Sequence, residues 1–77
     1  MSPADRDTIA VSTAEAQRNL GLTAHYAGLT ADALAVGNVE IALTAFRSLI
    51  LHARLASVDV RAIEGLATGA VHAEAAE

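Results

Sequence analysis

The stretch Asn38–Leu55, NVEIALTAFRSLILHARL, decides the fold that the sequence predicts. It is the longest uninterrupted helical pattern in the chain, and it contains the single Phe. On a helical wheel its apolar side chains cover an arc of roughly 200°, wider than one core-facing stripe requires. The residues in this arc are Val39, Ile41, Ala42, Leu43, Ala45, Phe46, Leu49, Ile50 and Ala53. The stretch is therefore either the central helix of a bundle or a helix that a second chain covers.

The polar arc of the same stretch contains two leucines. Leu51 and Leu55 lie there beside Arg47 and Arg54, where side chains should face water. These four residues form the candidate interaction site, in which the leucines are buried against another chain. The alternative is that another helix of the same chain folds over them.

Composition limits the chain to one domain, residues 1–77, with little core mass. The hydrophobic fraction is 53%, but alanine dominates it, and the chain has one Phe, one Tyr and no Trp. A domain of this size then needs close helix packing or association to be stable. We therefore expect self-association into a homo-oligomer.

Charge and targeting signals limit the classes of partner and the cellular location that the sequence predicts. The formal net charge is −4, all five basic residues are Arg, and the nine acids are scattered. Without a basic patch, neither nucleic acid nor membrane is an expected partner. The least charged window, Asn19–Phe46, falls short of a transmembrane span, and no leader pattern precedes it, so the expected location is cytoplasmic. The lack of Cys excludes disulfides and zinc thiolate sites.

Capping signals divide the chain into helices. Ser2 and Pro3 predict a helix start, and the first helix is expected over Pro3–Asn19 or from Thr13 only. Gly21 is a plausible end, although a helix that continues through it would lose only about 1 kcal/mol. Gly37 and Asn38 predict a left-handed stop followed by a new N-cap.

The remaining helices follow from these breaks. They are expected over Leu22–Val36, from Asn38 to about Ala56, and over about Val60–Ala73 after a cap within Ser57–Asp59. No alternating strand pattern occurs in the sequence. The predicted class is all-α, a small antiparallel bundle of three to four helices.

Tyr26 to Leu49 resembles a single tetratricopeptide repeat, over about a third of the chain. Tyr26 and Leu29 match the first helix of that family, Gly37 and Asn38 match its break, and Ala42, Phe46 and Leu49 match its second helix. The resemblance implies a helix-pair contact among Tyr26, Leu29, Ala42, Phe46 and Leu49, with Phe46 filling the space between the helices. It also implies a protein-binding role. The Gly-Asn-x-x-x-Ala-Leu junction is similar to that of the microtubule-interacting-and-transport (MIT) type of three-helix module.

Catalytic chemistry has no support in the sequence. His25, His52 and His72 fall on three different predicted helices, and none has a ligand at the spacing that preforms a metal pair. We expect no enzyme activity, no catalytic or metal-binding residue and no cofactor. The expected function is a non-catalytic protein–protein interaction module that self-associates or docks on a larger protein. The alternatives are a structural subunit of a homo-oligomeric or particle assembly and, with less support, a small regulator or inhibitor.

Overall fold

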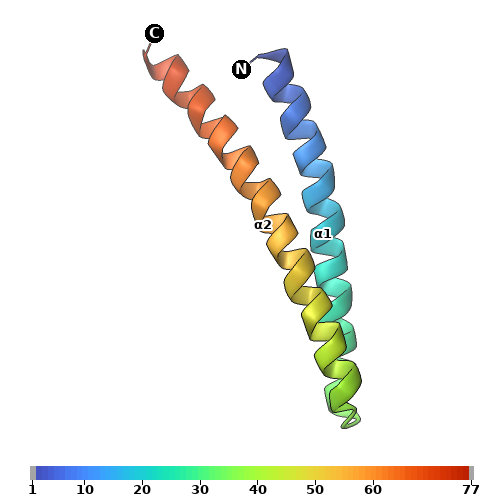
Figure 1. Cartoon of the computed structure of the whole chain (residues 1–77). Helices are drawn as coiled ribbons and strands as arrows, with labels where there is room; N and C mark the ends of the chain where they lie inside the picture. Colours follow the sequence, from blue (N-terminus) through green and yellow to red (C-terminus); the bar gives the residue numbers. More distant parts are fainter. Residues whose placement is uncertain (1, 77) are drawn as a thin grey trace.

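Two long helices account for the architecture. The structure is a computed structural model that describes the backbone of residues 2–76 and the side chains of residues 2–69. Helices α1 (Pro3–Ala35) and α2 (Val39–Ala76) form an antiparallel hairpin (Figure 1). The molecule is a rod with extents of 59 × 18 × 13 Å and a radius of gyration of 17.3 Å. A compact chain of this length would have a radius of gyration of about 11–12 Å.

The predicted all-α class is confirmed, because the described backbone is helical with no strand. The predicted division into three or four helices is wrong. α1 continues through Gly21 and α2 continues through Ser57 and Asp59. The small cost of a helical Gly is offset here, because the contact between the helices extends past both positions. The expected fourth helix is the second half of α2, and the side chains of its last residues, from 70 onward, lie outside the described part of the structure.

The turn between the helices was predicted correctly. Gly37 has φ 76°, a left-handed conformation that glycine adopts without a steric penalty. Its N–H donates to the carbonyl of Leu34 at 3.1 Å, and the N–H of Asn38 donates to that of Ala33 at 2.8 Å. This is the Schellman pattern, which satisfies the last carbonyls of α1. Asn38 then caps α2, since its Oδ1 accepts from the N–H of Ile41 at 3.2 Å.

The start of α1 also agrees with the sequence. Ser2 is the N-cap, and its Oγ accepts from the N–H of Asp5 at 3.1 Å. Pro3 occupies the first turn, where its missing N–H removes no helical bond.

A regular contact line, here called the seam, holds the two helices together. Its residues are buried or half-buried and alternate at spacings of three and four, as in a coiled coil. On α1 they are Ile9, Ser12, Ala16, Asn19, Thr23, Tyr26, Thr30 and Ala33. On α2 they are Ala42, Ala45, Leu49, His52, Ala56, Asp59, Ile63 and Leu66.

Small side chains make up the buried centre of the seam. The buried apolar residues are all alanines (Ala16, Ala33, Ala42, Ala45 and Ala56), and no large side chain among the described residues is fully buried. The helices lie close together near the turn and spread apart toward the termini (Figure 1). Ala33, Ala42 and Ala45 near the turn allow this close approach, because a methyl group adds little to the distance between helix axes.

Candidate interaction surface

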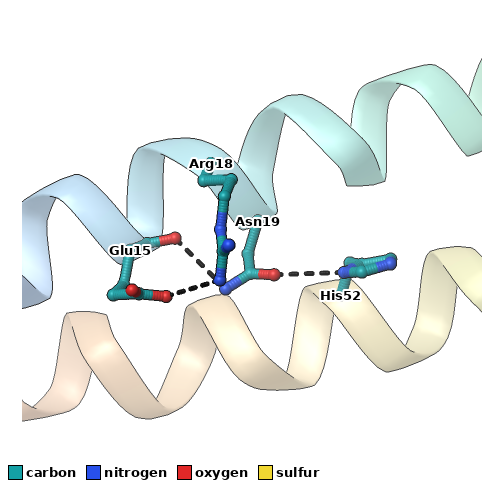
Figure 2. A network of polar contacts seen from close by, with 4 residues as sticks. All are labelled: Glu15, Arg18, Asn19 and His52. Atoms are coloured by element: carbon teal, nitrogen blue, oxygen red, sulfur yellow. Dashed lines mark hydrogen bonds and ion pairs between the residues drawn. The ribbon is translucent and has the colours of Figure 1, made fainter.

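One polar link crosses the middle of the seam (Figure 2). Asn19 is 4% exposed, and its Nδ2 donates to the carbonyl of Glu15 at 3.1 Å. Its Oδ1 lies 3.1 Å from Nδ1 of His52, on the other helix. Arg18 and Glu15 form an ion pair at 2.8 Å beside this link, on the outside of α1.

The bond to Glu15 fixes the tautomer of His52. Because the amide N–H of Asn19 is used within α1, the oxygen of Asn19 must accept, and Nδ1 of His52 must carry the hydrogen. A neutral ring with its hydrogen on Nδ1 and a protonated ring can both donate this bond. The ring of His52 also stacks on Tyr26, with centroids 5.6 Å apart and planes within 4°.

Two threonines of the seam on α1 form hydrogen bonds within their own helix. The hydroxyls of Thr23 and Thr30 donate to the carbonyls of Asn19 and Tyr26, both at 2.7 Å. Among the described residues, no buried side-chain nitrogen or oxygen lacks a partner. The seam therefore leaves no described buried polar side-chain atom without a hydrogen-bond partner, although it buries little apolar surface.

Most of the large apolar side chains lie on the outside of the hairpin, whereas Ile9, Leu49, Ile63 and Leu66 are half-buried in the seam. The more exposed of them range from Leu29, with 42% of its surface exposed, to Val36, with 80%. On α2 they occupy two flanks, one on each side of the seam, because the polar residues Glu40, Arg47, Arg54 and Arg61 recur every seven residues along the outer row. We name these the neutral flank and the leucine flank.

The neutral flank comprises Val39, Leu43, Phe46, Ile50, Ala53 and Val60. Phe46 belongs to it and is 46% exposed, which differs from the expected ring buried between the helices. The reason is the seam itself, because Ala42 and Ala45 bring the backbones too close to leave room for an aromatic ring between them.

The leucine flank contains Ile41, Leu51, Leu55 and Val58. The predicted candidates Leu51 and Leu55 are 55% and 44% exposed, so no other part of the described chain covers them. Arg47 and Arg54 lie on the outer row next to this flank, and both are exposed.

The predicted helix-pair residues divide between the seam and its borders. Ala42 is buried, and Tyr26 and Leu49 are half-buried in the seam. Leu29 is exposed and borders a shallow groove of about 280 Å³ near the turn. The groove is lined by Tyr26, Leu29, Glu40, Ile41, Thr44, Ala45 and Ser48, which places Leu29 on the side of the leucine flank.

Part of α2 has the length and composition of a membrane-spanning helix. This segment is Val39–Gly69, and 17% of its most apolar 18-residue stretch is buried in the hairpin. The sequence expectation considered only Asn19–Phe46. The segment also contains the row of Arg47, Arg54 and Arg61, and an arginine near the centre of a bilayer costs about 2.5–3.5 kcal/mol.

Neither a preformed metal site nor a family assignment emerges. The described residues contain no cluster of three His, Asp or Glu side chains suited to a metal ion. His25 is exposed and meets Tyr26 edge to face, while His72 lies outside the described side chains. Comparisons with protein-family models, curated proteins and solved structures gave no match. The resemblance to tetratricopeptide and MIT modules therefore stays a prediction.

Proposed function

We propose that this protein is a non-catalytic helical interaction module whose apolar flanks are buried by another protein chain. The observation that carries the proposal is the placement of side chains by size. Alanines form the buried contact, whereas Leu43, Phe46, Leu51 and Leu55 are each 44–55% exposed. Fully burying a side chain of this size contributes about 1.5–3 kcal/mol, and a single hairpin realises only roughly half of that contribution.

Protein is a better partner for these flanks than nucleic acid or lipid. The net charge of −4 opposes binding to phosphates, and the arginines of α2 lie in a single outer row instead of a patch. The same row would place charges in the hydrocarbon if α2 spanned a bilayer. A cytoplasmic location and the absence of a cofactor remain part of this proposal.

A structural subunit of a homo-oligomer is the second candidate. It is favoured by the presence of apolar flanks on both sides of α2, because each flank can receive a different neighbour. In that case Leu51 and Leu55 form a second contact in a larger assembly.

The molar mass in solution tests the proposal. Light scattering on the purified chain should give a multiple of 7.9 kDa at micromolar concentration, with the mass falling on dilution. A larger mass that does not change on dilution favours the structural subunit. A helical species that stays at the monomer mass, and that captures no protein in cross-linking, would contradict the interaction module.

A further inference from the structure

We propose that a second copy of this chain covers the neutral flank, so that two hairpins form a four-helix bundle in which α1 of each copy packs on α2 of the other. This inference rests on the proposed function and names its partner. It follows from surface area, from charge and from the match of side-chain sizes across the two helices.

The exposed area shows how much surface a partner must cover. The hairpin exposes 5417 Å². A folded monomer of 7.9 kDa is expected to expose about 4,400 Å². The excess is roughly 1,000 Å², and a stable protein–protein interface removes about 800 Å² from each partner. One neighbour of similar size is therefore enough to account for the excess.

The neutral flank continues onto α1 and forms a two-helix face. In an antiparallel helix pair, residues of the two helices that lie on the same side of the seam are next to each other. The groove places Leu29 on the side of the leucine flank. The row on the other side of the seam on α1 therefore borders the neutral flank of α2. Its residues are Leu20, Ala24, Ala27, Ala31 and Leu34. We name this combined surface the neutral face.

Charge distinguishes the neutral face from the opposite side. From Leu20 to Val60, its described residues carry no charged side chain. On the opposite side, Arg18, His25 and Asp32 of α1 accompany the leucine flank. Two copies that meet through the neutral face bring no like charges into contact, although each has a net charge of −4.

Side-chain size makes the neutral face complementary to itself. Residues equally far from Gly37 lie at the same height in the hairpin, so Ala31 is level with Leu43 and Ala24 with Ile50. Ala27 is level with Phe46 to within one residue, and so is Leu20 with Ala53. A twofold axis along the rod lays α1 of one copy over α2 of the other at equal height. Leu43, Ile50, Phe46 and Leu20 then each meet an alanine of the other copy, and large side chains meet each other only beside the turn, at Leu34 and Val39. This matching of one surface to itself is the requirement of an isologous contact.

Two matched pairs of substitutions test which face is used. Leu43→Glu with Phe46→Glu changes the neutral face at residues 51% and 46% exposed. Leu51→Glu with Leu55→Glu changes the leucine flank at residues 55% and 44% exposed, and serves as the control. Light scattering and circular dichroism are measured for both variants and for the parent chain. We expect the first variant to be a helical monomer and the control to keep the mass of the parent.

A size exchange tests the arrangement without adding charge. Ala27→Leu should raise the dissociation constant by roughly tenfold or more, because it overfills the place of Phe46 of the other copy. Adding Phe46→Ala to the same chain should return the dissociation constant toward that of the parent. Both substitutions are at exposed positions of a single hairpin, so its folding should be retained.

The outcomes separate this proposal from the proposed function. If the parent chain associates and only the leucine-flank variant has a lower molar mass, the proposal that a second copy covers the neutral face is overturned. The proposed interaction module remains in place. Failure of Phe46→Ala to rescue Ala27→Leu overturns the packing of α1 on α2. A parent that is monomeric in buffer and sediments with phosphatidylcholine vesicles overturns both proposals in favour of lipid.

Discussion

The seam and the flanks of this hairpin reverse the usual placement of side chains. The buried residues of the seam are alanines and Asn19, which contacts the half-buried His52, whereas the flanks expose Leu, Ile, Val and Phe. In most domains the large apolar residues fill the interior, because the apolar area removed from water is the main favourable term in folding. The difference indicates that the seam sets the alignment of the two helices. Most of the apolar area that could still be removed from water lies on the flanks.

The largest effect should come from enlarging a seam alanine. Ala42 is 3% exposed, and Ala42→Leu should lower the free energy of unfolding by about 3 kcal/mol, because the helices must separate to admit the side chain. Ala14→Leu, on the exposed side of α1, is the matched control and should change it by less than about 0.5 kcal/mol. Urea denaturation measures both. Equal midpoints would show that the seam is not closely packed.

The polar link should have an intermediate effect. His52→Leu keeps a large side chain but leaves the oxygen of Asn19 buried without a partner, which should cost about 1–2 kcal/mol. Adding Asn19→Ala removes that oxygen and should recover part of the loss. Thermal unfolding of the single and double variants gives the comparison. A double variant less stable than His52→Leu alone would mean that Asn19 contributes through its bond to Glu15.

The smallest effect should come from the ion pair outside the seam. The side chains of Arg18 and Glu15 are 68% and 47% exposed, so water and salt screen the pair. Arg18→Ala should change the free energy of unfolding by only about 0.2–0.5 kcal/mol. Repeating the urea titration in 1 M salt should remove the difference. A loss of unfolding free energy as large as that of His52→Leu would mean that this ion pair helps to hold the two helices together.

The sequence predicted the parts of the fold that depend on local chemistry. Ser2 as a cap, Gly37 with positive φ and Asn38 as the second cap all follow from single residues and their neighbours. The extra breaks at Gly21 and Ser57 were wrong, because a capping or flexible residue ends a helix only where tertiary contacts also end.

The exposed apolar surface of the hairpin was only partly predictable. Leu51 and Leu55 could be singled out because they interrupt a polar arc, and both are exposed in the structure, whereas their burial by another chain stays a prediction. The seam was not, because a search for large apolar residues passes over the spacing of Ala16, Asn19 and Thr23. The pairing of Asn19 with His52 joins residues 33 positions apart, and no local pattern indicates it.

The left-handed turn at Gly37 also determines how conformational entropy is lost during folding. Each seam contact pairs residues at similar distances from this turn, so every contact formed shortens the loop that the next one must close. Loop closure therefore costs most at the first contact, beside a turn of a few residues, and little afterwards. Contact between two flanks has no such link and requires the loss of translational freedom of a whole chain. The hairpin can thus align itself at any concentration, whereas the proposed covering of its flanks by another chain would depend on the concentration of that chain.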